Sequence, residues 1–403
     1  MVVNIEFLDL EPIENMITCL NYEVDKVIFF GYEDAITKNS EHTERFLTRH
    51  CGVSSVEFHS LSETNLDEIL EQMSAVIERE QASSNQVFFD ITGGEGLMLL
   101  AFGILYEPSL GLAPVIVDEV FAVINRLNKE KQLPMHMFDI ESGWLYQLNR
   151  EVKPTLSEAV TKRHIPLDID MYIQMYGGVV NHSMHKDTKS LDDPEFAKDA
   201  EGLWEICSKY KKTWNIFCEF LREYCQPDAN LQVVMDIDDV KAKIATKSKY
   251  NRKDMTNIFN ECSDLGVLEN LTSDGKYCTF RYKSSKIQDQ LWDAGSILEL
   301  HTYMEYASQN DDCRVGVHID WDGTIHGGWG RDTVNEIDVL ALKGYIPTFI
   351  SCKNGNVDQM ALYELATVAG RFGGKYAKKV LVAPQGMNKS HRIRAREMNI
   401  EVK

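Results

Sequence analysis

Residues 87–103 read VFFDITGGEGLMLLAFG, an apolar run that ends at Asp90, a Thr92-Gly93-Gly94 turn and a second apolar stretch of helical length. The first run is typical of a buried strand, and the glycines mark the turn into a helix. Adjacent glycines let a backbone approach a ligand closely, and the free amides of a helix start favour phosphate. The stretch predicts a strand–loop–helix unit that binds a nucleotide or phosphodiester, although tight strand–helix packing also explains such glycines.

The same alternation of strand and helix extends over residues 1–150. Short apolar runs at 2–10, 25–32, 54–61 and 85–92 are separated by amphipathic stretches with helical spacing, and further strands are expected at 113–117 and 134–140. Strands that alternate with helices indicate βαβ units and a mostly parallel sheet. We therefore predict a Rossmann-like domain over residues 1–150.

The middle of the chain is more mixed. Residues 151–200 are expected to form a linker region with one helix. From 201 to 285 the order is a helix over 203–225, two further helical stretches ending at Gly266, and a hairpin turning at Asp274–Gly275. That order is typical of a winged helix. A small helical spacer with a hairpin explains it equally well, because no dense Arg/Lys cluster indicates that the segment reads DNA.

The C-terminal part, 286–403, predicts a small α/β core. A helix is expected at 296–309, strands at 313–321, 336–342 and 346–353, a helix at 358–374, a strand at 378–385 and a basic end. The chain as a whole is therefore expected to be an α/β protein.

Composition and charge narrow the function classes. The net charge is −20, but residues 1–150 carry −16, whereas the last 33 residues carry nine bases and two acids. Only the C-terminal part suits a polyanion. The longest apolar region is interrupted by Glu107, Pro108 and Pro114, so no membrane span is expected, and the acidic N-terminus does not resemble a signal peptide. Nine dispersed cysteines favour reduced thiols and a cytoplasmic protein.

The stretch NEIDVLALKGYIPTFISCKNG, 335–355, carries the sharpest chemical signal. A hairpin centred at Gly344 or Tyr345 places Asp338 opposite 351–353, with Ser351 and Lys353 on one face of the return strand. A carboxylate that holds Mg²⁺ or Mn²⁺, next to a lysine that acts on the scissile phosphate, suits metal-dependent phosphodiester cleavage. An ordinary cross-strand salt bridge is the alternative.

The N-terminal strand-Asp-Ile-Thr-Gly-Gly-helix pattern resembles CARF domains, the cyclic oligoadenylate sensors of type III CRISPR systems. The resemblance implies a dimer whose ligand groove is lined by the loops after the first two strands and by the glycine loop. A family Thr-Lys is replaced by Glu95-Gly96, which removes a phosphate partner. The corresponding ligand-binding residues are Leu10, Glu11, Pro12, Gly31, Tyr32, Thr92, Gly93, Gly94 and Glu95.

The C-terminal part resembles the PD-(D/E)xK nucleases, and GSILE (295–299), NEIDVL (335–340) and FISCKNG (349–355) resemble the nuclease half of CARF nucleases. The resemblance implies that Asp338 and Glu299 bind the metal and that Lys353 is catalytic. Ser351 stands where the motif has an acid. Glu364, on the next helix, is the candidate replacement ligand, with a solvent-facing helix acid as the alternative. Glu336 shares the parity of Asp338 and is a candidate assisting residue.

Together the two halves predict a homodimeric, metal-dependent nuclease that cleaves DNA or RNA when cyclic tetra-adenylate binds. A non-catalytic sensor with a degenerate nuclease domain is the second hypothesis, supported by Ser351. A ring nuclease that degrades its own ligand would need Tyr32 or Glu11 as the reactive group. The absence of a G-x-x-x-x-G-K-[ST] motif argues against a P-loop NTPase, and the absence of G-x-S-x-G argues against an α/β-hydrolase.

Overall fold

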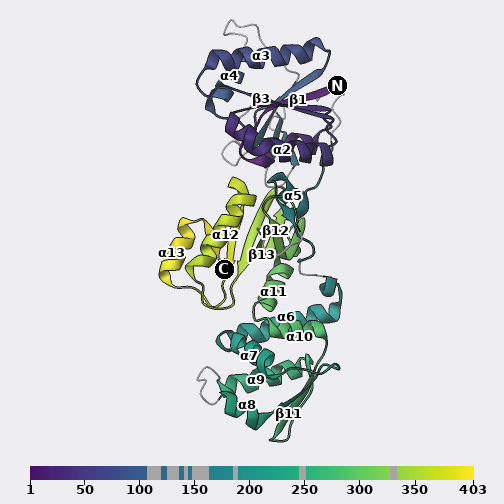
Figure 1. Ribbon diagram of the computed structural model, residues 1–403, viewed down its shortest axis with the longest axis vertical. Helices are drawn as coiled ribbons and strands as arrows, with labels where there is room; N and C mark the ends of the chain where they lie inside the picture. Colours follow the sequence, from purple (N-terminus) through teal and green to yellow (C-terminus); the bar gives the residue numbers. More distant parts are fainter. Residues whose placement is uncertain are drawn as a thin grey trace.

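The computed structural model describes residues 1–106, 119–124, 136–139, 144–147, 163–184, 189–244, 251–326 and 334–403. These residues form an α/β structure with three sheets, which follow one another along the long axis of the molecule (Figure 1). The N-terminal sheet lies at one end and a three-stranded sheet at the other. The C-terminal sheet lies between them, so the end of the chain returns to the middle of the molecule.

The N-terminal sheet has the strand order β3-β2-β1-β4-β5-β6-β7 and is parallel except for the β6–β7 pair. The predicted strands at 2–10, 25–32, 54–61 and 85–92 are confirmed, and β6 falls within 134–140. The strand expected at 113–117 lies outside the described residues. The strands are β1 (Val2–Phe7), β2 (Lys26–Gly31), β3 (Ser55–Ser60), β4 (Gln86–Asp90), β5 (Glu119–Ile124), β6 (His136–Asp139) and β7 (Trp144–Gln147).

Helices cover both faces of this sheet because its central strands are apolar on both sides. On β2, Val27 and Phe29 pack with the α1–α2 side, whereas Ile28 and Phe30 pack with α3 and α4. Figure 1 shows α2 on the side that faces the C-terminal sheet and α3 on the far side. The helices are η1 (Pro12–Asn15), α1 (Ile17–Asn21), α2 (Glu33–His50), α3 (Leu66–Ala82) and α4 (Gly96–Tyr106).

The expected linker, 151–200, is divided in the structure: residues 163–184 pack between the two large sheets, and residues 189–200 pack in the core around the three-stranded sheet. It contains α5 (Ile169–Met175), β8 (Val179–Val180), η4 (Lys189–Asp192) and the start of α6. Strand β8 pairs with a strand of the C-terminal sheet, and Tyr172 and Ile173 of α5 are buried in the core that both large sheets share. Apolar residues at helical spacing therefore make this segment part of the fold.

The three-stranded sheet, in the order β10-β11-β9, packs with helices around the buried Trp214. The hairpin turn at Asp274–Gly275 is confirmed, with Gly275 at φ +90°. The single helix expected at 203–225 is two helices, separated at Tyr210. The elements are α6 (Pro194–Lys209), α7 (Lys211–Tyr224), β9 (Gln232–Asp236), α8 (Ile237–Ile244), α9 (Arg252–Asp264), β10 (Leu268–Ser273), β11 (Tyr277–Tyr282) and α10 (Ser285–Trp292).

The helix break at Tyr210 has a tertiary cause. The hydroxyl of Tyr210 and the Nζ of Lys209 both donate to the carboxylate of Glu261 on α9, each at 2.6 Å. These contacts hold the end of α6 on α9 while the backbone of Tyr210 leaves the helical region, at φ −109° and ψ 33°. The local pattern of apolar residues continues through the break, so it gave no sequence signal.

The C-terminal sheet has the order β16-β15-β14-β13-β12-β8, antiparallel from β8 to β14 and parallel from β14 to β16. Helix α11 packs on one face and α12 on the other. The predicted order of helix, three strands, helix and strand is confirmed. The elements are α11 (Ser296–Ala307), β12 (Asp312–Asp320), β13 (Val334–Lys343), β14 (Ile346–Cys352), α12 (Gln359–Phe372), η5 (Gly374–Tyr376), β15 (Lys378–Val382), α13 (Lys389–Glu397) and β16 (Ile400–Val402).

Two further expectations concern the whole chain. All nine cysteines are free thiols, seven of them buried. Among the described helices, none combines the length and the apolar character that crossing a membrane requires.

Candidate active site and ligand-binding loops

The β13–β14 hairpin places Asp338 at the centre of a small polar cluster. Val339 pairs with Ile350, so Asp338 lies opposite Ser351, as the sequence predicted. The Oδ2 of Asp338 accepts hydrogen bonds from the Ser351 hydroxyl at 3.1 Å and from the Cys352 amide at 2.6 Å. The Nζ of Lys353 lies 3.8 Å from the same oxygen. All three contacts use Oδ2, so Oδ1 keeps its capacity to bind a ligand.

The backbone of Lys353 is fixed by a hydrogen bond, whereas its side-chain ammonium group is exposed. Its amide donates to the carbonyl of Val382 on β15 at 2.9 Å, which fixes the end of β14. The side chain is 38% exposed, compared with 16% for Asp338. An ion pair at 3.8 Å with one partner this exposed contributes little to stability. The ammonium group therefore lies at the surface, and its charge is not neutralised by a buried salt bridge.

The two faces of the hairpin have different surroundings. Leu340 and Phe349, which share the parity of Asp338 and Ser351, pack in the core with α12. Val339 and Cys352 have the opposite parity and pack against Leu298 of α11. The Sγ of Cys352 lies 3.5 Å from the Oγ1 of Thr302, also on α11. Cys352 therefore points to the α11 side of the sheet.

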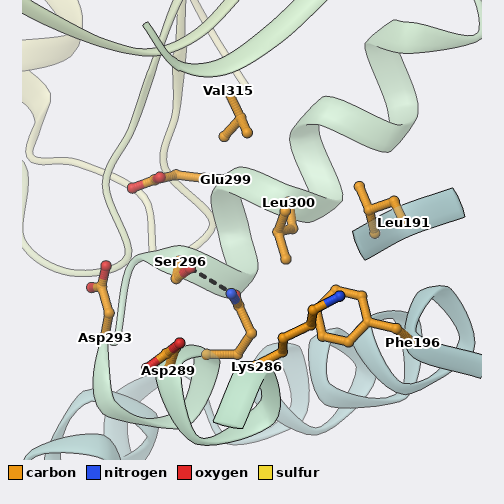
Figure 2. Close-up of a pocket in the computed structure, with 10 residues that line it drawn as sticks. Leu191, Phe196, Lys286, Asp289, Asp293, Ser296, Glu299, Leu300 and Val315 are labelled. Carbon is orange, nitrogen blue, oxygen red and sulfur yellow. Dashed lines mark hydrogen bonds between the residues drawn. The ribbon is translucent and has the colours of Figure 1, made fainter. Parts of the chain in front are cut away.

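Glu299 lies on α11, across the sheet from Asp338. It is 8% exposed and borders a cavity of about 330 Å³ in which Asp293, Ser296 and Lys286 also lie (Figure 2). Burial raises the pKa of the Cys352 thiol, and the carboxylates of Asp338 and Glu299 raise it further. Both carboxylates are therefore close enough to act on the same thiol, although only Glu299 borders this cavity.

The remaining candidate acids are exposed. Glu364 lies on the outer side of α12 with Met360, which is 59% exposed, whereas Leu362 and Leu365 face the sheet. This position favours the alternative of a solvent-facing helix acid, and the role of Glu364 as a replacement ligand stays a prediction. Glu336 is exposed and lies across the strand pair from His318, with 3.8 Å between Oε2 and Nε2.

The positions of these candidate acids determine which side chains could act as ligands of a metal ion. In the part of the chain that the structure describes, no three His, Cys, Asp or Glu side chains are grouped to hold a metal ion. Asp338 presents a carboxylate oxygen on the face of Lys353, 3.8 Å from its Nζ. Because Mg²⁺ commonly takes one or two carboxylates and completes its shell with water and substrate phosphates, Asp338 fits such an ion as its single protein carboxylate. The three-acid set expected from the sequence is not assembled.

The glycine loop after β4 lies against the loop after β1. The Oδ2 of Asp9 accepts a hydrogen bond from the Gly94 amide at 3.2 Å, and its Oδ1 accepts one from the Glu11 amide at 3.0 Å. A β-carbon on Gly93 would lie 2.9 Å from the carbonyl oxygen of Phe7, and Gly94 has φ +94°. The glycines are thus required for packing on β1. Asp9 joins the two loops and was missed, because a single acid after a strand has no distinctive signal.

The other predicted ligand-binding residues fall into two groups. Some border the glycine loop or the surface: Glu95 is exposed, Thr92 is partly exposed and Leu10 is 49% exposed. Others are packed: Tyr32 is 8% exposed, and Gly31 approaches Leu8 so closely that a β-carbon would lie 3.1 Å from it. Leu10 and Pro12 also line a separate cavity that extends towards the C-terminal sheet.

Glu11 does not line an open groove. Its carboxylate accepts hydrogen bonds from the hydroxyl of Tyr176 and, at 2.8 Å, from the amide of Lys375 in η5. The carboxylate of Glu14 lies 2.6 Å from the Nζ of Lys375 and accepts a hydrogen bond from the hydroxyl of Tyr376. Burial raises the pKa of both carboxyls. The loop after β1 is therefore bonded to the segment after α12, and the expected role of Glu11 as a ligand contact stays a prediction.

The same contacts weaken the ring-nuclease hypothesis. The Glu11 carboxylate is already engaged, and burial raises the pKa of the Tyr32 hydroxyl. Neither group is poised as a base or nucleophile.

A buried acid pair lies beneath the glycine loop. Glu6 and Asp90 are register partners on β1 and β4, and both are at most 2% exposed. Burial raises the pKa of Asp90 to about 6, and burial together with the charge of Asp90 raises the pKa of Glu6 strongly. Asp90 also accepts the amide of Thr92 at 2.8 Å and the hydroxyl of Thr18. The pair therefore anchors the base of the loop.

Comparison with known proteins gives likeness in structure only. No family model and no curated protein matches the chain. Similar solved structures include protein VC1899 from Vibrio cholerae (TM-score 0.66, 15% identity) and Can2 from Sulfobacillus thermosulfidooxidans, in complex with cyclic tetra-adenylate (TM-score 0.59, 12% identity). Each comparison covers 100% of this chain and 93% of the other. A type III CRISPR defence DNA nuclease activated by cyclic oligoadenylate has a TM-score of 0.42 and 12% identity, over 94% of this chain and 45% of its own, which is too distant to support an argument. The chain therefore shares the fold of VC1899 and Can2 along its whole length.

Proposed function

We propose that the chain is a nuclease that cyclic oligoadenylate switches on, with cyclic tetra-adenylate as the activator, and that it acts in type III CRISPR defence. The observation that carries the proposal is the Asp338–Ser351–Lys353 cluster at the end of a hairpin, in a fold shared over its whole length with Can2, which was solved with cyclic tetra-adenylate. The cluster supports the proposed phosphodiester cleavage, and the fold shared with Can2 supports cyclic tetra-adenylate as the proposed activator.

In the proposed reaction, Lys353 acts on the scissile phosphate. Its exposed ammonium group lies at the surface and is oriented by Asp338, so it stabilises the negative charge that develops on the phosphate oxygens. The chemistry that Mn²⁺ or Mg²⁺ would supply when bound is Lewis-acid activation of the phosphate and of a water. Asp338 would hold that ion through Oδ1, while Ser351 and the Cys352 amide keep the carboxylate oriented.

The substrate is proposed to be DNA or RNA bound along the basic end of the chain. On α13, Lys389, Arg392 and Arg396 are exposed, and His391 bonds to the carbonyl of Val357 in the loop after Lys353. This contact ties the basic helix to the catalytic hairpin. Phosphate contacts from such side chains position a nucleic acid without reading its sequence.

The activator is proposed to bind at the glycine loop of a homodimer. A cyclic ligand with internal symmetry suits a two-fold axis between identical subunits. The structure offers a route by which activator binding could reach the nuclease half. The amide of Gly94 in the glycine loop donates to Asp9, and Asp9 is followed closely in the chain by Glu11. Glu11 accepts a hydrogen bond from the amide of Lys375, which follows α12. Binding that moves the loop would bias the position of α12, which packs on the catalytic hairpin.

The deciding experiment incubates the full chain with labelled DNA and RNA, with Mn²⁺ or Mg²⁺, in the presence and absence of cyclic tetra-adenylate. The proposal expects cleavage only when metal and activator are both present. Activator-independent cleavage would contradict the switch, and saturable activator binding without any cleavage would contradict the nuclease.

The second candidate is a cyclic-oligoadenylate sensor that does not cleave. It is favoured by Ser351 and by the lack, in the described residues, of a grouped set of three metal-binding side chains. It predicts that Asp338→Ala changes neither activator binding nor any nucleic-acid cleavage, whereas the leading proposal expects that variant to lose cleavage.

A further inference from the structure

A cavity of about 550 Å³ lies between the two large sheets, and its lining includes Leu10 and Pro12 of the loop after β1 but no residue of the glycine loop. One wall is α2, from which Lys38, His42 and Arg45 line the cavity at positions i, i+4 and i+7. The opposite wall includes Arg371 of α12 and Trp321 after β12. The cavity is therefore built by both halves of the molecule.

The nitrogen-bearing side chains converge on two adjacent glycines. A β-carbon on Gly177 would lie 3.4 Å from the Nδ1 of His42 and 3.9 Å from the Nη2 of Arg371. A β-carbon on Gly323 would lie 3.9 Å from the Nη1 of Arg45 and 2.7 Å from the carbonyl oxygen of Gly177. Gly177 lines this cavity and Gly323 lines a smaller neighbouring one that also contains His42 and Arg45, so the absence of side chains at both positions leaves room beside these nitrogen atoms.

The lining holds three permanent cations, Lys38, Arg45 and Arg371, and two acids, Glu41 and Asp322, which leaves a surplus of one positive charge. Glu41 is paired with Arg45 at 2.5 Å, and Asp322 is paired with His326 at 3.3 Å. Within the described residues, Lys38 and Arg371 have no carboxylate partner. Burial lowers the pKa of Arg371 with no opposing carboxylate. A partly desolvated guanidinium without a counterion is costly, so an anion in the cavity would relieve this cost.

Two buried donors point to the same conclusion. The Nε2 of His42 and the Nε1 of Trp321 are shielded from water and have no hydrogen-bond partner in the described part of the chain. Burial, followed by the charges of Arg371 and Arg45, lowers the pKa of His42 to about 4. The histidine is kept neutral mainly by its burial, and the two neighbouring guanidinium groups act in the same direction.

We propose that this cavity is a second ligand site, which binds a phosphate-bearing anion of mononucleotide size through Lys38, Arg45 and Arg371. The volume falls in the range of small-molecule pockets. Guanidinium groups suit phosphate oxygens because they donate in pairs, and the Trp321 and Tyr176 rings offer apolar surface to a nucleoside. Because the ligand contacts both α2 and α12, its binding stabilises the contact between the two sheets. The proposal stands independently of the nuclease activity.

The test measures binding to the full-length protein by calorimetry, with adenosine monophosphate and with inorganic phosphate as separate probes. Saturable binding of adenosine monophosphate is expected, weakened at least about tenfold by Arg371→Gln and by Lys38→Gln, which each remove a charged phosphate contact. Arg222→Gln, on an exposed part of α7, is the matched control and should bind as the unmodified protein does. Circular dichroism melting checks that each variant is folded.

Cyclic tetra-adenylate separates this site from the proposed activator site. Gly93→Val should lose cyclic tetra-adenylate binding and keep adenosine monophosphate binding. No saturable binding of either probe, or equal binding by all folded variants, would overturn the proposal. Equal affinity for phosphate and adenosine monophosphate would overturn its nucleotide part. If adenosine monophosphate competes with cyclic tetra-adenylate and Arg371→Gln loses both, the cavity is the activator site itself and no second site exists.

Discussion

Asp90 and Asp338 are both strand carboxylates that accept a backbone amide, yet they have opposite properties. Asp90 is fully buried, bonds to Thr18 and Thr92, and has its pKa raised to about 6 by burial. Asp338 is partly exposed and faces the ammonium group of Lys353. Asp90 therefore stabilises the glycine loop at the N-terminal sheet, whereas Asp338 exposes a carboxylate at the C-terminal sheet. The difference lies in access to water and in the nearest cation.

The largest effect on cleavage is expected from a change at the exposed site, where Lys353 faces Asp338. Lys353→Ala should reduce cleavage at least about 100-fold, the scale of removing one preorganised transition-state contact. Binding of cyclic tetra-adenylate should not change, because Lys353 is remote from the glycine loop. Single-turnover cleavage with saturating activator measures this. Lys343→Ala, at the exposed end of the same hairpin, is the control, and a wild-type rate in Lys353→Ala would exclude the proposed role.

The next effect concerns the loop above the buried pair. Gly93→Val places carbon atoms against the carbonyl of Phe7, where even a β-carbon would lie at 2.9 Å. Overpacking of this kind costs about 1–3 kcal/mol of folding stability and forces the backbone to shift. Because the shifted backbone belongs to the proposed activator loop, activator affinity should fall about tenfold or more. Calorimetry with cyclic tetra-adenylate checks this. Gly96→Ala has open space around it and should bind normally; unaltered binding by Gly93→Val would place the activator elsewhere.

A third change tests whether the site around Asp338 lacks an acid. Ser351→Glu adds a carboxylate on the face of Asp338 and should lower the metal concentration for half-maximal cleavage about tenfold, because affinity for hard cations rises with the number of charged ligands. A metal titration of cleavage measures it. Glu364→Gln should titrate like the unmodified protein, since Glu364 lies on the outer side of α12; a higher metal requirement in Glu364→Gln would restore it as a ligand.

The contact between the two sheets provides a fourth test. Glu11→Gln leaves an amide where Tyr176 and Lys375 now meet a carboxylate, and loss of charge-assisted hydrogen bonds costs about 1–3 kcal/mol. The activator concentration for half-maximal cleavage should rise about fivefold or more, with catalysis at saturation little changed. A dose–response curve measures the shift. An unchanged curve would show that the signal does not pass through Glu11.

The smallest effect is a difference in pH dependence at Asp90. Its folded pKa, about 6, is above its ordinary value of 3.8, so its contribution to stability is present below about pH 4 and is lost as the pH rises through about 6. Asp90→Asn keeps an acceptor for Thr92 and removes the titration. Between pH 4 and pH 7 the free energy of unfolding of the unmodified protein should fall by about 2 kcal/mol more than that of Asp90→Asn. Parallel denaturant-unfolding curves at both pH values would contradict the raised pKa.

Much of this molecule follows from local pattern. The order of strands and helices, the Gly275 and Gly344 turns and the pairing of Asp338 with Ser351 are all readable, because strand alternation and turn chemistry act over a few residues. The glycine loop was also identified, although its glycines serve packing on β1 as well as any ligand.

Tertiary structure alone decided where the helices put their side chains. Glu299 and Glu364 lie on helices that cover opposite faces of the C-terminal sheet, Glu11 bonds to Lys375, 364 positions later in the chain, and Lys38 comes to share a cavity with Arg371. Strand parity is a property of the backbone and can be counted along the sequence. Which face a helix covers, and which distant acid or cation it meets there, depends on how apolar surfaces from remote segments pack together, and no local pattern encodes that choice.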